Sequence, residues 1–214
     1  MNIKDLKDKF TVYVFCDGSV SAEEREMLVR AMEAAATLFG CWFYMPADGD
    51  WGDFSADAVV SRAPVNSRGQ LGASEILTMM KAAFKAKNLK GAMFIFTGKD
   101  LYLKDTWCFG AARVGGGVSV QSMARFRELA PADKQAVISR TLRHELGHIH
   151  RLAADHERRN IEKKYGWHCT SPGCTMRQSP TLKALLEHVA EEDPGNCLCE
   201  LCREDLERFK QKYY

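Results

Sequence analysis

The sequence lacks any long hydrophobic run. No stretch of its 214 residues approaches the roughly 18 apolar residues that a membrane-spanning helix needs. The opening residues MNIKDLKDKF contain neither an apolar signal core nor a small-residue cleavage site. We therefore expect a protein that does not enter a membrane and that works in the cytoplasm, where thiols stay reduced.

An excess of charge of one sign is also missing. The chain carries 30 Lys and Arg against 28 Asp and Glu, and residues 151–214 balance 11 against 11. A nucleic-acid module should show a concentrated basic face, so nucleic acid is not an expected partner. There are no internal repeats, low-complexity tracts or coiled-coil patterns, which favours a monomer whose function depends on individual motifs.

The first part of the chain alternates between strand and helix patterns. Residues 10–16 (FTVYVFC) are typical of a buried strand. Ser21 and Glu24 form a capping-box pattern, which predicts a helix that ends near Gly40. Residues 41–45 are a second strand candidate. Residues 46–72, rich in Gly, Asp and Ser, indicate a long surface excursion.

The alternation continues to about residue 120. A helix is predicted over residues 73–86, and a strand over residues 91–97 (GAMFIFT). Residues 108–120 contain two short strand-like runs around three consecutive glycines, which predicts a hairpin. The pattern favours an α/β fold with a mostly parallel sheet, helices on its faces and an antiparallel strand at its edge.

The helical pattern that begins at Pro131 carries the first chemical motif. His144, Glu145 and His148 form an HExxH sequence on an amphipathic helix. Residues four apart share one face of a helix, so both imidazoles can bind one zinc ion. Glu145 follows the first ligand directly and can act as general base toward a water molecule at the metal.

The eight cysteines fall into two groups. Three are isolated among apolar neighbours and are predicted to be buried free thiols: Cys16, Cys41 and Cys108. The other five crowd into the last quarter, which in a reducing compartment favours metal over disulfides. The spacing CxxxxC…CxxC of four of them suits a tetrahedral zinc site, and these are Cys169, Cys174, Cys199 and Cys202. Cys197 could substitute as a ligand, but it is expected to be a free thiol beside the site. His150 and His188 are expected to be solvated.

Together these motifs resemble the archaemetzincin family of metallopeptidases. The resemblance rests on HELGH, on the run HC-x₄-C-x-M and on the later CxxC, and it spans about residues 97–202. It implies a metzincin-like twisted mixed sheet with flanking helices, an active-site helix and a small zinc-bearing C-terminal subdomain. We accordingly divide the chain into residues 1–149 and 150–214.

The resemblance also implies a role for each matching residue. His144, His148 and His168 would bind a catalytic zinc, and Met176 would form the Met-turn beneath it. The four clustered cysteines would bind a second, structural zinc. The predicted activity is peptide-bond hydrolysis by a zinc-activated water with Glu145 as general base.

The spacing after the second histidine departs from the family pattern. Arg151 stands where the family has Gly and Ala154 where it has the third His, and 14 extra residues precede His168. A straight helix would carry residue 165 about 25 Å away, at about 1.5 Å per residue. His168 can reach the metal only if residues 150–166 go out and return, with Gly166 at the closing turn.

Alternatives to His168 therefore stay open. His156 could be recruited, a carboxylate from Glu187 or Glu191 could complete the site, or only two protein ligands could remain. In the last case the protein would be a zinc-stabilised peptide-binding module with little or no activity. The extension, in turn, could cap the cleft and narrow the substrate range.

A peptide or protein substrate is the expected partner. It would lie along an edge strand by backbone pairing. The residues predicted to form that strand are Phe109, Gly110, Ala111 and Ala112.

Overall fold

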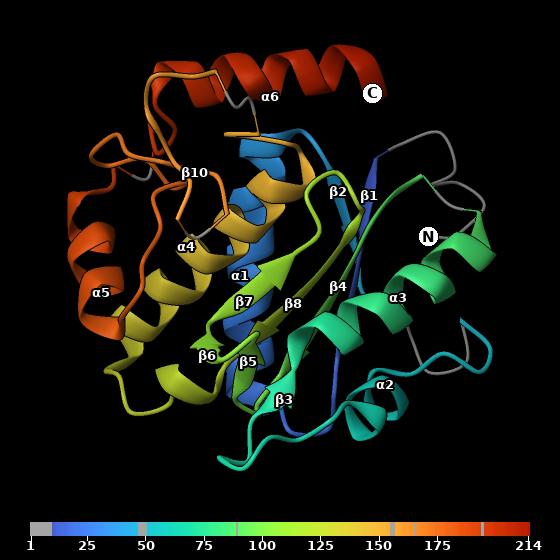
Figure 1. Cartoon of the computed structure of the whole chain (residues 1–214). Helices are drawn as coiled ribbons and strands as arrows, with labels where there is room; N and C mark the ends of the chain where they lie inside the picture. Colours follow the sequence, from blue (N-terminus) through green and yellow to red (C-terminus); the bar gives the residue numbers. More distant parts are fainter. Residues whose placement is uncertain (1–9, 47–50, 89, 155–156, 165, 194) are drawn as a thin grey trace.

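A computed structural model describes residues 10–46, 51–88, 90–154, 157–164, 166–193 and 195–214 (Figure 1). Helices and strands alternate through the first two thirds of the chain, and the last third is mainly loop and helix. In chain order the elements are β1 (Thr11–Cys16), α1 (Ala22–Phe39), β2 (Trp42–Tyr44), α2 (Ala56–Arg62), β3 (Leu71–Gly72), α3 (Ala73–Lys87), β4 (Gly91–Thr97), β5 (Leu101–Leu103), β6 (Thr106–Cys108), β7 (Gly110–Ala112), β8 (Val118–Ser122), the 3₁₀ turn η2 (Ala124–Phe126), α4 (Pro131–Ile149), β9 (Ile161–Glu162), β10 (His168–Cys169), α5 (Leu182–Glu191) and α6 (Glu200–Tyr213).

The central sheet has five strands in the order β2-β1-β4-β8-β7. The first four are parallel, and β7 pairs antiparallel with β8 at the edge. The connecting turn contains Gly115 and Gly117, whose φ angles of 61° and 68° lie in the left-handed region that glycine favours. The predicted mostly parallel sheet with an antiparallel edge hairpin is thus confirmed.

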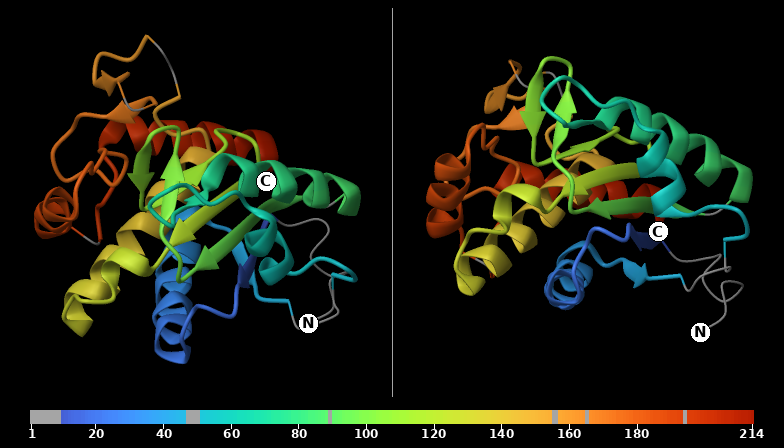
Figure 2. Two further views of the ribbon diagram at one scale, coloured as in Figure 1. Left: turned by 60° about the horizontal axis from the view of Figure 1, so that its bottom comes forward. Right: turned by 90° about the horizontal axis from the view of Figure 1, so that it is seen from below.

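Helices cover both faces of this sheet (Figures 1 and 2). Strand β4 is buried on both sides, and its side chains alternate between two apolar clusters. Phe94 and Phe96 pack toward α1 and α4, whereas Met93 and Ile95 pack toward α2 and α3. A strand that is buried on both faces has a continuous apolar sequence, and this is why the run GAMFIFT predicted β4 correctly.

The caps of α1 follow the sequence signals. The Ser21 hydroxyl accepts a hydrogen bond from the Glu24 backbone N–H, and the Glu24 carboxylate accepts one from the Ser21 backbone N–H. The helix ends at Gly40, with φ of 66°. Arg127 also pairs with Glu24 at 3.0 Å, which ties this cap to the turn before α4.

The expectation of a surface excursion over residues 46–72 was wrong in part. This segment contains α2 and β3, and Val59 and Val60 of α2 are buried. The Ser55 side chain caps α2 by accepting from the Ala58 N–H at 3.0 Å. The abundant Gly and Asp of this segment made it look like a loop. Helix α2 has only seven residues, and its apolar positions are too few to show helical periodicity. Residues 47–50 lie outside the described part.

The last third of the chain wraps around the C-terminal end of α4 (Figure 1). Strands β9 and β10 form a two-stranded antiparallel sheet, and α6 crosses the top of the molecule. One apolar cluster contains Leu146 and Leu152, which lie on opposite sides of the predicted 149/150 boundary. That boundary stays a prediction. No helix in the described residues has both the length and the apolarity of a membrane span.

Candidate functional site

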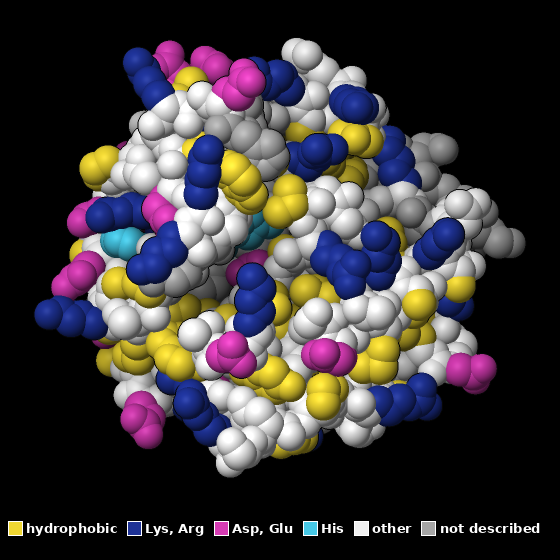
Figure 3. All heavy atoms as spheres, viewed as in Figure 1, with side chains coloured by type: hydrophobic (Ala, Val, Ile, Leu, Met, Phe, Trp, Pro, Cys, Tyr) yellow, Lys and Arg dark blue, Asp and Glu magenta, His cyan; other side chains and the backbone are white. Residues whose placement is uncertain are grey.

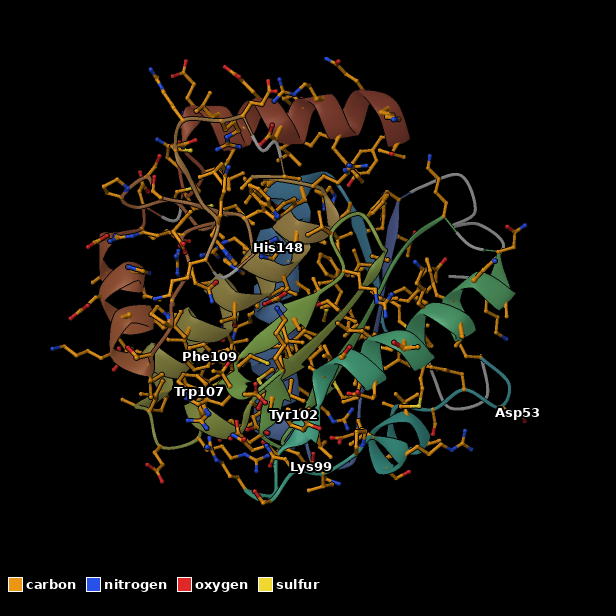
Figure 4. All side chains as sticks on the ribbon, viewed as in Figure 1. Asp53, Lys99, Tyr102, Trp107, Phe109 and His148 are labelled. Atoms are coloured by element: carbon orange, nitrogen blue, oxygen red, sulfur yellow. The ribbon has the colours of Figure 1, made fainter. Side chains whose placement is uncertain are left out.

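Three histidines converge at the C-terminal end of α4. His144 and His148 are one helical turn apart, and their Nε2 atoms lie 3.2 Å from each other. The Nε2 atom of His168, from β10, lies 3.1 Å from that of His148. Figure 4 shows His148 on α4, with Phe109 and Trp107 at the neighbouring strands. The three residues form a histidine trio whose ligand atoms all lie within 4.8 Å of one another.

Burial of the trio favours the neutral form of its imidazoles, which is the form that a metal requires. Burial lowers the pKa of His148 to about 4 and that of His168 to about 3, and it holds the pKa of His144 well below its usual value. His144 Nδ1 lies 2.8 Å from the Thr175 carbonyl oxygen, to which it donates, so its Nε2 presents a lone pair. Three neutral nitrogens facing one point fit a zinc ion.

Glu145 lies beside the trio and against the edge strand. Its carboxyl group is buried, and burial raises its pKa to about 8. Gly110 of β7 makes room for it, because a Cβ at that position would lie 2.8 Å from Glu145 Oε1. Among the described residues, no hydrogen-bond partner satisfies Glu145 Oε2. A buried carboxyl group with an unsatisfied oxygen can exchange a proton with a molecule bound beside it.

The path of the chain after α4 explains how His168 joins the trio. The helix ends at Ile149, and Arg151 takes a left-handed φ of 61° where the family pattern has glycine. The chain then returns through β9 to β10, with Gly166 at φ of 103° before the second strand. On its other side β10 is bonded to the next loop, because the Cys169 N–H donates to the Met176 carbonyl at 3.0 Å. Residues 150–166 thus go out and return.

The alternative ligands are not brought to this point. Glu191 pairs with Arg177 at 2.7 Å, and Glu187 lies 3.9 Å from Lys183 on an exposed face of α5. Neither carboxylate belongs to the group formed by the trio. His156 lies outside the described residues.

Met176 lies directly under the helix that carries HExxH. Its side chain is fully buried and touches Gly147, where a Cβ would overlap the Met176 sulfur. Gly147 is therefore the residue that lets the loop approach α4 between the two histidines. That Met176 forms a Met-turn stays a prediction.

Four cysteines form a second cluster next to the trio. The ligand atoms of this cysteine tetrad lie within 4.8 Å of one another, and its members are Cys169, Cys174, Cys199 and Cys202. Cys169 directly follows His168, so the two clusters share β10. Four thiols around one point fit a tetrahedral zinc site. Cys197 is buried and lies outside the tetrad, as expected of a free thiol.

The extension contributes polar groups that the sequence did not reveal as functional. Arg158 donates to the Cys202 sulfur at 3.4 Å, and Asn160 donates to the Cys169 sulfur at 3.3 Å. Arg158 also forms an ion pair with Asp205 of α6. N–H donors around clustered thiolates offset their negative charge. No local pattern identifies such residues, because their role depends on where the extension folds.

A second buried network holds the loop that carries Met176. Arg140 and Arg143 of α4 both pair with Glu192, at the end of α5. Arg140 also donates to the carbonyl oxygens of Cys174 and Arg177, at 3.2 and 3.1 Å. One guanidinium therefore joins α4 to both ends of this loop, one turn before His144.

The trio and Glu145 open into a cleft of about 750 Å³. All four residues of the predicted substrate strand line it, and β7 presents its unpaired edge there. The Phe109 ring packs on Trp107 and Phe126. The opposite wall includes Leu185 and the loop before α5.

The solved structures with a similar fold include two archaemetzincins. An archaemetzincin from Methanopyrus kandleri matches with a TM-score of 0.66 and 21% identity, covering 95% of this chain and 97% of that one. An archaemetzincin from Archaeoglobus fulgidus, complexed with malonate, matches with a TM-score of 0.63 and 22% identity, covering 92% and 99%. The chain has an archaemetzincin-like fold. No protein-family model matches the sequence, and no curated protein does.

Two histidines of this archaemetzincin-like fold are not solvated, contrary to expectation. His150 is fully buried between Phe10, Phe39 and Phe209, and its Nε2 lies 2.9 Å from the Tyr214 hydroxyl. The prediction assumed that a different helix face meant solvent, but α6 covers that face. His188 is also buried, with Nδ1 2.8 Å from the Ser179 hydroxyl.

The left-handed residue after α4 gives a test of this helix end. A non-glycine residue at φ near 60° is destabilised by about 1 kcal/mol or more. Arg151→Gly should therefore raise the free energy of unfolding by about 1 kcal/mol in urea denaturation. The matched control is Arg159→Gly, which is exposed and has no left-handed φ, and it should be neutral or destabilising. Equal effects of the two substitutions would contradict the assignment.

Arg158 gives a test of the extension's hold on the tetrad. Arg158→Met removes the N–H donors and should speed metal loss from the thiolate site about tenfold or more. With Co²⁺ loaded, loss of the sulfur-to-metal charge-transfer absorption to a chelator reports this site alone. Arg159→Met, the exposed neighbour, is the control and should behave as the unmodified protein. Release rates unchanged by Arg158→Met would show that the contact has no influence on the tetrad.

Proposed function

We propose that the protein is a zinc-dependent metallopeptidase that hydrolyses peptide bonds. One observation carries the proposal: the histidine trio, the buried carboxyl of Glu145 and the unpaired edge of β7 all face one cleft. A metal site with a purely structural role requires neither an unpaired acidic group nor an open strand edge. The archaemetzincin-like fold supports the same proposal.

His144, His148 and His168 would hold the zinc ion, and three protein ligands leave a fourth position open. When bound there, zinc supplies Lewis acidity, which polarises a carbonyl group and lowers the pKa of a water molecule. A positive charge held by the trio also favours the ionised form of Glu145, which burial alone disfavours.

Glu145 would move the proton. Its carboxylate removes a proton from the attacking water and then delivers it to the amine nitrogen of the departing peptide. The cleft that holds it is partly closed to solvent, which strengthens this exchange. Thr175 positions the reaction indirectly, because its carbonyl oxygen fixes the orientation of the His144 ring.

The substrate backbone would pair with β7. Only one edge of this strand is used in the sheet, and Gly110, Ala111 and Ala112 leave the other edge uncovered by large side chains. An extended peptide added there would pass across Glu145, which lies against Gly110.

A second zinc ion would occupy the tetrad and stabilise the fold. The tetrad joins the segments around Cys169, Cys174 and Cys199, which also pack within one apolar cluster. Its metal would therefore hold β10, and with it His168, in place.

Metal content tests the assignment of both sites. Elemental analysis of the full-length protein, purified without chelator, should give two zinc ions per chain. His168→Ala should reduce the content to one, and the control His188→Ala, outside the trio, should leave it at two. Two ions in both variants would contradict His168 as a ligand. One ion in all three proteins would favour a zinc-stabilised binding module.

Replacement of the base tests turnover. Glu145→Gln should keep both metals and lower peptide hydrolysis by about 10²- to 10⁴-fold, since it removes the proton acceptor but hardly changes the volume. Glu187→Gln, on the exposed face of α5, should have no effect. Residual hydrolysis equal to that of the unmodified protein would overturn the proposed role.

A further inference from the structure

Around the cleft, the fold brings together basic side chains that are far apart in the sequence. Arg68 precedes β3, Lys104 occupies the turn between β5 and β6, and Lys163 and Lys164 follow β9. All four line the cleft and all four are exposed. In Figure 3 dark-blue Lys and Arg side chains surround the hollow in which a cyan His side chain is visible. We call these four residues the basic rim.

Basic side chains outnumber acidic ones in the lining of this cleft. The lining residues include two carboxylic acids, Asp105 and the buried Glu145. Arg140, the fifth basic lining residue, is already paired with Glu192. Among the residues that the structure describes, no ion pair involves Arg68, Lys104 or Lys163. A cleft with walls of low polarity focuses the field of such charges toward its interior.

The interior of the cleft shows which kind of anion would be recognised. The strand edge of β7 offers alternating backbone N–H and C=O groups, which pair with a polypeptide and not with a nucleic acid. Carboxylate side chains on such a peptide would project to both sides of the bound strand, into a cleft whose lining includes Lys104 and Lys163. We propose that the substrates are acidic peptides, with Asp or Glu flanking the bond that is cleaved.

This inference rests on the proposed peptidase function but uses different residues. The basic rim would act on binding and on the rate of association, since its charges lie at the mouth of the cleft and not at the reacting atoms. Its effect should appear in KM and weaken at high salt, whereas loss of Glu145 should appear in kcat.

Binding to a variant without turnover separates the two proposals. The zinc-loaded Glu145→Gln protein is titrated with fluorescent peptides that are identical except for the residues flanking the central bond, which are all Glu, all Ala or all Lys. The Glu peptide should bind about tenfold more tightly than the Ala peptide, and high salt should remove the difference. The Lys peptide should bind least.

Charge reversal supplies the decisive comparison. Adding Lys104→Glu, Lys163→Glu and Lys164→Glu should invert the preference, so that the Lys peptide binds best. A control with Lys81→Glu and Lys85→Glu changes exposed residues of α3 that do not line the cleft, and it should keep the preference for Glu. Unfolding of each variant is followed by circular dichroism, so that a misfolded variant is not scored.

Two results would overturn the inference. One is equal affinity for the three peptides, or a preference that the reversal leaves intact. The other is equally tight binding of a single-stranded oligonucleotide, which would indicate a general polyanion surface. Hydrolysis of the same peptides by the unmodified protein is a separate measurement, and its absence would count against the peptidase proposal while the binding data still decide the charge preference.

Discussion

Helix α4 has to stop directly after His148, and the rest of the candidate site depends on that stop. A helix that continued through the extension would carry the chain away from the trio at about 1.5 Å per residue. The left-handed turn at Arg151 and Ala153 prevents this, although neither residue favours that conformation. Tertiary contacts hold the turn: Leu152 is buried, and the Ala153 N–H donates to Asp205 of α6 at 3.0 Å.

The same arrangement makes the histidine trio and the cysteine tetrad mechanically dependent. His168 and Cys169 are adjacent in β10, so one strand supplies a residue to each cluster. On one side β10 pairs with β9, and on the other the Cys169 N–H binds the Met176 carbonyl. Any movement of the tetrad would therefore shift His168. In the proposed function, a rigid thiolate cluster would position His168, a ligand that α4 itself cannot supply.

Local signals predicted much of the fold and part of the site. The strand GAMFIFT, the capping box at Ser21 and the hairpin at the three glycines each specify their structure from neighbouring residues. HExxH likewise specifies its own geometry, because a helix places His144 and His148 on one face. The convergence of His168 could be inferred only from its fixed spacing to the cysteines, since the path between residues 150 and 166 is set by tertiary contacts.

What the sequence could not reveal depends on elements distant in the chain. His150 is buried because α6, more than 50 residues later, covers it, and Arg158 acquires its role from the position of the tetrad. The basic rim is a further case, since Arg68, Lys104 and Lys163 come from three separate segments. A balanced net charge excludes a strong electrostatic field of one sign around the whole molecule. It does not show where the fold concentrates its cationic side chains.

The extension that breaks the family spacing contacts two different parts of the molecule. One set of contacts is structural, and the other lies at the cleft. Through Arg158 and Asn160 it is tied to the tetrad, and through Lys163 and Lys164 it reaches the cleft. Lengthening a loop adds only a modest entropic cost, because closure entropy grows with the logarithm of length. The contacts of Arg158 and Asn160 act against this cost. In the proposed function, the extension adds positive charge to the substrate path while its contacts with the tetrad fix its position.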